Sequence, residues 1–155
     1  MRPFGFGLSY TTFGYTDLTV DAGVAAGDTF TARVTVTNTG DIAGTEVVQL
    51  YGHDVLASVT RPTVQLLGYQ RVALEPGGSA VVDFTVPTTR LAFSDRALTR
   101  VVEPGDVEIW VGAHARASAA DGGRPSRART ARSSTPVPRS CEHCRAQPRR
   151  APCCA

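Results

Sequence analysis

The four cysteines, Cys141, Cys144, Cys153 and Cys154, are the residues best suited by type to bind a metal ion. Cys141 and Cys144 have the spacing of a zinc knuckle, and four thiolates could ligate one tetrahedral zinc ion. Structural zinc sites usually pair two short-spaced knuckles, however, and the adjacent Cys153 and Cys154 make a poor second knuckle. We therefore favour a chance accumulation of cysteines over a zinc site, and expect neither a bound metal nor a cofactor.

Residues suited to hydrolysis or phosphate binding form no recognisable site. His53, Asp54 and Ser58 have the composition of a catalytic triad. No nucleophile elbow accompanies them, and a triad is defined by its geometry rather than its composition. Gly5-x-Gly7 lacks the third glycine, the preceding strand and the following helix of a phosphate-binding loop. The sequence therefore predicts no catalytic residue.

Charge divides the chain of 155 residues near residue 113. Residues 1–112 hold 7 Arg against 12 acidic residues, whereas residues 113–155 hold 9 Arg against 2, so the total charge of +2 is a cancellation. The basic part could contact phosphates, but it lacks the interleaved aromatic residues that stack on bases. We expect no specific nucleic-acid partner. Because this part has few large apolar residues and no periodicity, the sequence predicts that 113–155 is a disordered tail.

The elements of residues 1–112 follow a period of two. Apolar and polar residues alternate in 29–37, 80–86 and 107–111, as expected of strands that bury one face. The segments 45–51 and 64–74 are more continuously apolar, which is typical of central strands, and 17–22 is a further strand candidate.

Turn residues separate these segments. Gly, Pro, Asn and Asp gather at 26–28, 38–41, 75–78 and 103–106, and no window has the apolar stripe of a helix. The pattern predicts an all-β, antiparallel sandwich of about seven strands, of the immunoglobulin or fibronectin type III-like class. We expect a linker at 1–15, a sandwich at 16–112 and the tail at 113–155.

Several motifs in this region, in order, resemble a known family. They are Pro3-Phe4-Gly5-Phe6-Gly7-Leu8-Ser9-Tyr10-Thr11-Thr12-Phe13, Asn38-Thr39-Gly40, Gly44-Thr45-Glu46-Val47-Val48-Gln49-Leu50-Tyr51, Arg61-Pro62, Leu67-Gly68-Tyr69-Gln70-Arg71-Val72, Leu74-Glu75-Pro76-Gly77 and Val111-Gly112. About 110 residues resemble the C-terminal fibronectin type III-like domain of glycoside hydrolase family 3, whose members include β-glucosidases and β-xylosidases. The first motif resembles the stretch that leads into this domain.

The resemblance implies a noncatalytic accessory domain. In the family, the nucleophile is an Asp of an N-terminal (β/α)8 barrel, and neither the barrel nor its partner domain is expected in this sequence. A retaining glycosidase needs two carboxyl groups about 5–5.5 Å apart. Asp17, Asp54, Asp83 and Asp95 stand where solvated strand ends or turns are expected. The domain would stabilise the missing catalytic domains of a truncated enzyme that hydrolyses O-glycosyl bonds.

The resemblance also suggests which residues contact the catalytic domains. They are the junction aromatics Phe4, Phe6, Tyr10 and Phe13, with Arg61 and Pro62 in a loop. The alternative function is a free-standing carbohydrate-binding or adhesion module. Sugar sites on sandwiches generally need exposed aromatic platforms, for which Tyr51 and Trp110 are the obvious candidates, so carbohydrate stays open as a partner.

Neither a membrane-spanning run nor a signal peptide is recognisable. No apolar stretch approaches the roughly 20 residues of a membrane helix. Residues 1–13 have one Arg but no long apolar core and no small-residue cleavage site. We expect no membrane partner, and the sequence gives no localisation.

Overall fold

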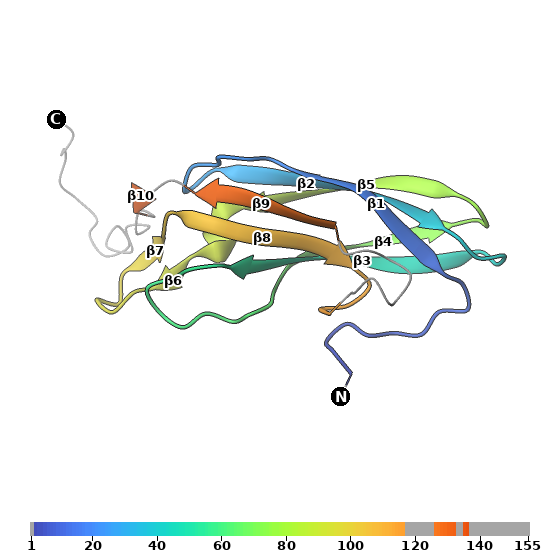
Figure 1. Cartoon of the computed structure of the whole chain (residues 1–155), viewed down its shortest axis with the longest axis horizontal. Coiled ribbons are helices and arrows are strands. Elements are labelled where there is room, and N and C mark those ends of the chain that lie inside the picture. Colours follow the sequence, from blue (N-terminus) through green and yellow to red (C-terminus); the bar gives the residue numbers. More distant parts are fainter. Residues whose placement is uncertain (1, 117–125, 133–134, 137–155) are drawn as a thin grey trace, which may run out of the picture.

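The computed structural model describes residues 2–116, 126–132 and 135–136. Two antiparallel sheets pack face to face as a sandwich (Figure 1), with strand orders β1-β2-β5 and β4-β3-β8-β9. A small sheet of order β10-β7-β6 lies at one end. The elements are β1 Phe13–Val20, β2 Thr29–Asn38, β3 Gly44–Asp54, β4 Gln65–Leu74, β5 Ser79–Pro87, the 3-10 turn η1 Thr88–Leu91, β6 Phe93–Ser94, β7 Arg100–Val102, β8 Gly105–Gly112, β9 Ser126–Arg132 and β10 Thr135–Pro136.

The core lies between the two sheets and confirms the period-two pattern. Fully buried side chains of β2 alternate with Thr and Arg on the outer face, and β5 and β8 contribute in the same way. The core is formed by Tyr15, Phe30, Ala32, Val34, Val36, Val48, Leu50, Leu67, Leu74, Val82, Phe84, Val86, Leu91, Val107, Ile109 and Val111. These side chains are mostly branched or aromatic and carry few polar atoms, so their burial stabilises the sandwich without hydrogen-bonding demands. The predicted all-β sandwich is therefore confirmed.

The first and fourth strands differ from the prediction. β1 begins at Phe13, four residues before the expected strand, so the last residues of the predicted linker 1–15 lie in the sheet. A β-bulge between Thr16 and Thr19 interrupts its pairing with β2, and Asp17 has a φ of 55°. This bulge shifts the alternation of side chains, which hid the first half of the strand. β3 is central as expected, but β4 is the edge strand of its sheet.

The segment after Gly112 contains structure that hydrophobic periodicity does not signal. Residues 126–132 form β9, which pairs antiparallel with β8 along Gly105–Val111, and Thr135–Pro136 pair with β7. Main-chain hydrogen bonds add an edge strand without requiring an apolar face. The structure therefore differs at these residues from the expected disorder. The other residues of the predicted tail beyond 116, with all four cysteines, lie outside the described residues.

Candidate functional site

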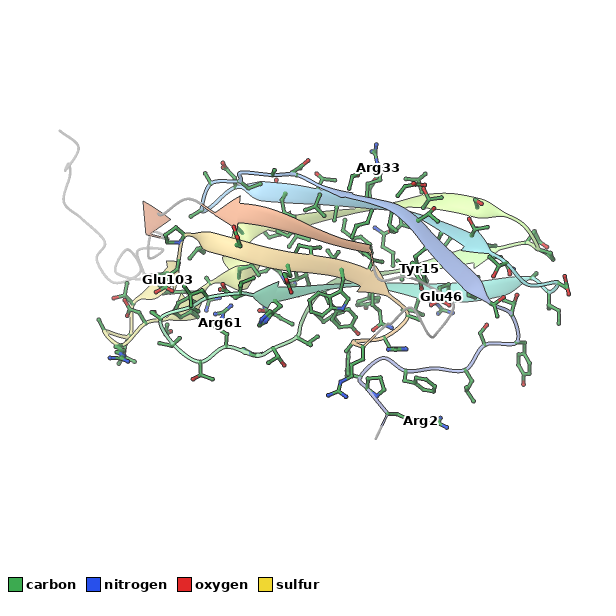
Figure 2. All side chains as sticks on the ribbon, viewed as in Figure 1. Arg2, Tyr15, Arg33, Glu46, Arg61 and Glu103 are labelled. Atoms are coloured by element: carbon green, nitrogen blue, oxygen red, sulfur yellow. The ribbon has the colours of Figure 1, made fainter. Side chains whose placement is uncertain are left out.

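Residues 2–12, here called the N-terminal segment, run outside the two sheets on the side of β3 and β8 (Figure 2). Most of their side chains are exposed, including several large apolar ones. The exposed fractions are 69% for Phe4, 85% for Leu8 and 99% for Tyr10. The segment therefore presents large apolar side chains outward, although the sandwich has a well-filled core.

Contacts with β3 and with the residues after β8 hold the start of this segment. The Ala115 N–H donates to the Phe4 carbonyl at 2.9 Å. The Gln49 Nε2 donates to the Ala113 carbonyl at 2.5 Å and to the Gly5 carbonyl at 3.4 Å. Gly5 has a φ of 80°, and a Cβ there would overlap the Gln49 amide. A side chain at residue 5 would thus both strain the backbone and displace Gln49.

Asn38 holds the other end of the segment. Its Oδ1 accepts a hydrogen bond from the Thr11 hydroxyl at 2.6 Å and from the Gly40 N–H at 3.1 Å. Its Nδ2 donates to the carbonyls of Ile42 at 2.8 Å and Leu74 at 3.1 Å. Asn38 is fully buried, so these four partners satisfy a polar side chain that would otherwise be costly inside the protein. The segment enters β1 at a fixed position as a result.

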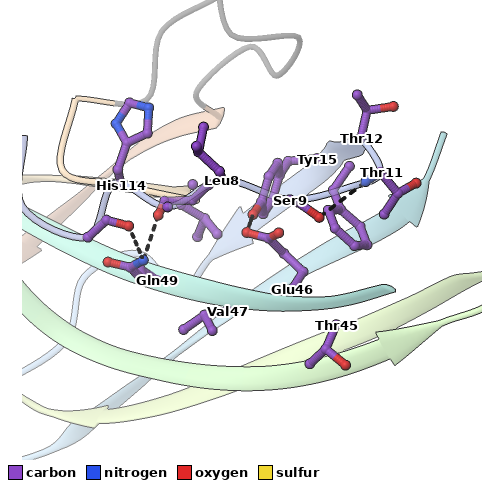
Figure 3. A pocket seen from close by; sticks show the side chains of 16 residues that line it. Leu8, Ser9, Thr11, Thr12, Tyr15, Thr45, Glu46, Val47, Gln49 and His114 are labelled. Atoms are coloured by element: carbon purple, nitrogen blue, oxygen red, sulfur yellow. Dashed lines mark hydrogen bonds between the residues drawn. The ribbon is translucent and has the colours of Figure 1, made fainter. Parts of the chain in front are cut away.

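A cavity of about 340 Å³ lies between the N-terminal segment and the sandwich (Figure 3). Its lining comes from the segment, from β1, from the first half of β3, from the end of β8 and from the residues that follow it. Glu46 and Tyr15 point toward one another within the lining, and the Tyr15 hydroxyl donates to Glu46 Oε1 at 2.9 Å. His114, which contacts the Phe6 ring at a centroid distance of 5.6 Å, lines the same cavity.

Burial changes the acid–base properties of the Tyr15–Glu46 pair. Desolvation raises the pKa of Glu46 above its ordinary value, while the hydrogen bonds from Tyr15 and from the Val47 backbone act in the opposite direction. Desolvation, with the adjacent carboxyl, also raises the pKa of Tyr15 far above its ordinary value. Tyr15 therefore stays a hydroxyl donor at neutral pH, and Glu46 is a carboxyl group that ionises less readily than a solvated one.

The predicted junction residues fall into two separate groups. Phe4, Phe6 and Tyr10 project from the N-terminal segment, whereas Phe13 is half-buried against the core. Arg61 lies in the loop between β3 and β4, far along the molecule from Arg2 (Figure 2). The structure thus places the first three aromatics on one segment and does not bring Arg61 to it. That either group contacts a further domain stays a prediction.

The loop at Arg61 is attached to the sandwich by that side chain. The Arg61 Nη2 donates to the Leu91 carbonyl at 2.9 Å, and its guanidinium lies over the Phe93 ring at 4.6 Å from the centroid. Such a cation–π contact and hydrogen bond fix the loop against η1 and β6. Pro62 is exposed next to this anchor. Arg61 therefore has a structural role within the domain, and Pro62 is the part of the pair that is accessible.

Tyr51 and Trp110 do not form the exposed platform that the sugar-binding hypothesis requires. Their exposed fractions are 1% and 6%, and their rings stack at a centroid distance of 5.9 Å with an interplanar angle of 20°. The Tyr51 hydroxyl donates to Gln49 Oε1. Both side chains lie in the outward register of β3 and β8, as the alternation predicts. The two rings, however, stack on one another. This corrects the expectation that they offer a stacking surface to a sugar.

The acidic residues considered for catalysis have separate structural surroundings. Asp83 pairs with Arg33 at 2.6 Å on the outer face of the β1-β2-β5 sheet. The Asp95 Oδ1 accepts from the N–H groups of Ala97 and Thr99 in the β6–β7 turn. No group of three or more potential metal ligands occurs among the described residues, and no helix in this part of the chain is long and apolar enough to cross a membrane.

Glu46 and Asn38 are the site residues that the sequence reasoning missed. Glu46 occupies the inward register of Val48 and Leu50 on β3. A charged residue on the buried face of an alternating strand is a signal that could have been noticed, because isolated buried charges are rare. Asn38 ends β2 next to a turn sequence, which favoured its interpretation as an ordinary turn residue.

Residues 46–115 match the family model of the fibronectin type III-like domain. The chain is 47% identical over 116 residues to a β-xylosidase of Formosa agariphila, a match that covers 74% of this chain and 16% of the relative. It is 40% identical over 113 residues to a periplasmic β-glucosidase of Salmonella typhimurium, covering 72% of this chain and 15% of the relative. The chain therefore spans about one sixth of the length of these relatives.

Solved structures of β-glucosidases contain a similar fold. A β-glucosidase of Listeria innocua in complex with glucose superposes with a TM-score of 0.76 at 30% identity, covering 87% of this chain and 18% of that one. The domain model covers residues 46–115, and the sequence matches and the superposition each cover most of the chain. The chain therefore carries a fibronectin type III-like domain that belongs with the C-terminal region of family 3 β-glucosidases and β-xylosidases.

Proposed function

We propose that this domain is a noncatalytic accessory domain of a family 3 β-glycosidase. It docks against the catalytic domains and stabilises them, and the assembled enzyme hydrolyses O-glycosyl bonds. The observation that carries this proposal is the N-terminal segment, which exposes Phe4, Leu8 and Tyr10 while its backbone is fixed to the sandwich. The similarity to β-glucosidases and β-xylosidases supports the choice of partner.

The apolar character of the segment supports docking rather than solvation. Three large apolar side chains within seven residues are each at least two-thirds exposed. Several large exposed apolar side chains in one short segment are typical of an interaction site. The segment is also ordered by hydrogen bonds at both ends, through Gly5 and Thr11. A preordered apolar strip loses little conformational entropy on docking, which favours a stable interface.

The distribution of carboxyl groups supports a noncatalytic role. A retaining glycosidase places two carboxyl groups about 5–5.5 Å apart on either side of the scissile bond. Here Asp83 is paired with Arg33, Asp95 holds a turn, and Glu46 is bonded to Tyr15. The purified chain should therefore give no turnover of aryl β-glucosides or aryl β-xylosides. Turnover that survives a mock purification, and that disappears when a carboxyl group of this chain is replaced, would contradict the proposal.

A domain replacement tests docking directly. The matching 116 residues of the Formosa agariphila β-xylosidase are replaced by the corresponding part of this chain, and the yield, thermal midpoint and aryl-xyloside turnover of the hybrid are measured. We expect a soluble, active hybrid, because the two domains are 47% identical. A hybrid that aggregates or loses activity while the exchanged domain itself is folded would contradict the accessory role.

Two leucines provide a matched pair for the hybrid. Leu8 in the N-terminal segment is 85% exposed, and Leu98 at the tip of the β6–β7 hairpin is 81% exposed. Leu8→Ala should lower the thermal midpoint of the hybrid by several degrees, since it removes apolar area from the interface. Leu98→Ala removes the same atoms elsewhere and should leave the midpoint unchanged. Equal effects of the two substitutions would remove the N-terminal segment from the proposed interface.

A further inference from the structure

The cavity beside the N-terminal segment exists because β8 leaves β3 halfway along. β8 pairs with β3 over Gln49–Asp54 only, so among the described residues Gly44–Val48 of β3 have no strand partner on that side. The N-terminal segment passes this gap and lines the cavity of about 340 Å³ without filling it. The cavity thus opens on the face that the proposed function assigns to docking.

Among the described residues that line the cavity, Glu46 is the one with a carboxylate side chain. Its exposed fraction is 9%, and it accepts hydrogen bonds from the Tyr15 hydroxyl and from the Val47 backbone. Within the part of the chain that the structure describes, no basic side chain makes an ion pair with Glu46, whereas Asp83 on the other sheet is paired with Arg33. A carboxylate so deeply placed is costly unless a cation accompanies it.

The cavity lining combines apolar side chains with polar ones such as Ser9, Thr11 and Gln49. Leu8 is 85% exposed and Val47 is 37% exposed, and both also line the cavity. A buried carboxylate in a cavity that is partly apolar suits a cationic side chain with an apolar stem, and arginine is the charged residue most enriched at strong interface contacts. Arginine suits such a site better than lysine, because its planar guanidinium offers parallel donors to a carboxylate and its weaker hydration lowers the cost of burial.

We infer that this cavity receives an arginine side chain of the docked catalytic domain, with its guanidinium paired to the Glu46 carboxylate. The inference rests on the proposed docking function and names the chemistry of one contact in it. Tyr15 orients the carboxylate by its hydrogen bond, and Leu8 covers the arginine methylenes. Glu46 is then the residue of this domain that selects a basic contact on the partner.

The test uses the complete chain with a small probe, so that it does not depend on a catalytic domain. The chain is titrated with N-acetyl-arginine methylamide, and the backbone and side-chain NMR signals of Tyr15, Glu46 and Val47 are followed. The matched probe is N-acetyl-citrulline methylamide, which has nearly the same shape without the charge. We expect saturable shifts at these three residues with the arginine probe, and an affinity for the citrulline probe lower by at least about tenfold.

Three variants assign the binding to the carboxylate. Glu46→Gln keeps the shape and an acceptor for Tyr15, and should weaken binding of the arginine probe by at least about tenfold. Asp83→Asn removes one exposed carboxylate of equal charge and should leave the affinity unchanged. Tyr15→Phe keeps the Glu46 carboxylate, so it should retain most of the binding of the arginine probe. It is also the folding control, because it breaks the same hydrogen bond without removing the charge.

Other outcomes would overturn the inference. They are equal responses to both probes, an unchanged affinity in Glu46→Gln, no saturable shift at the cavity up to the solubility of the arginine probe, or saturable shifts there with glucose or xylose instead. The domain replacement described above is independent of this result. A working hybrid with a negative titration would leave docking intact and remove the arginine contact. A failed hybrid with a positive titration would leave an arginine-binding cavity and overturn its assignment to a docked catalytic domain.

Discussion

The β2–β5 half of the sandwich and the N-terminal segment treat apolar side chains in opposite ways. β2 buries Phe30 and Val34 completely and exposes threonines and one arginine. The N-terminal segment exposes Leu8 and Tyr10 and turns its hydrogen-bonding groups toward the sandwich. Leu98 and Tyr69 are also exposed elsewhere, but the N-terminal segment has three large exposed apolar side chains within seven residues. The contrast indicates that the core is complete within this domain. It favours a separate partner as the group that buries the apolar side chains of the N-terminal segment.

The largest expected effect is in the core. Phe30→Ala should lower the free energy of unfolding by about 3–5 kcal/mol, since Phe30 is 0% exposed and its removal leaves a cavity. This loss is a large part of the total stability that a domain of this size has. Chemical denaturation measures the change. Thr29→Ala on the exposed face of the same strand is the control, and should change stability by less than about 0.5 kcal/mol.

A smaller loss is expected at Asn38, where the two regions join. Asn38→Ala should cost about 2–3 kcal/mol, because it leaves buried groups such as the Leu74 carbonyl without their hydrogen bonds. It should also release the N-terminal segment, seen as faster cleavage of residues 2–12 in limited proteolysis. Thr11→Val removes only the hydroxyl bonded to Asn38 and should cost about 1 kcal/mol. Equal losses in the two variants would show that the other bonds of Asn38 do not contribute.

Phe30 and Asn38 differ in how well their structural roles can be predicted from the sequence. The alternation of Phe30 to Val36 reports burial directly, because a strand that buries one face repeats every second residue, and the core was predictable from it. No comparable sequence pattern indicates the role of Asn38. Its four hydrogen bonds join residues up to 36 positions apart, so its role depends on how the strands meet rather than on its neighbours in sequence.

The candidate site was predictable in part for the same reason. Phe4, Phe6 and Tyr10 stand out as aromatics in a glycine-rich stretch, and a resemblance indicated their position at a junction. The cavity was hidden, since it arises where β8 stops pairing with β3, which is a property of register. Tyr51 and Trp110 show the opposite error. Their outward register was predictable, whereas their mutual stacking required the pairing of Tyr51 with Trp110 across β3 and β8.

The stability contribution of Glu46 in the cavity should depend on pH, unlike that of the apolar core. Burial holds the pKa of Glu46 above its unfolded value, with Tyr15 on β1 and His114 after β8 as the other titratable groups of the lining. A raised carboxyl pKa stabilises the fold while the group is protonated, and this contribution is lost as pH rises through the folded-state pKa. Glu46→Gln cannot ionise, so its stability relative to the wild type should increase from acidic to neutral pH. Urea denaturation at both pH values measures this difference, and a difference that is constant or falls with pH would contradict it.

The smallest effect on stability is expected at Tyr10. This substitution tests most directly whether the N-terminal segment belongs to the core or to an interface. Tyr10 is 99% exposed, so Tyr10→Ala should change the free energy of unfolding of this chain by less than about 0.5 kcal/mol. If the N-terminal segment docks, the same substitution should lower the thermal midpoint of the β-xylosidase hybrid by several degrees, because an aromatic ring leaves the interface. Tyr69→Ala on β4, where the tyrosine is 66% exposed, is the matched control and should spare the hybrid. A large loss in the isolated chain would mean that Tyr10 packs within this domain, and the segment would then belong with the core rather than with a partner.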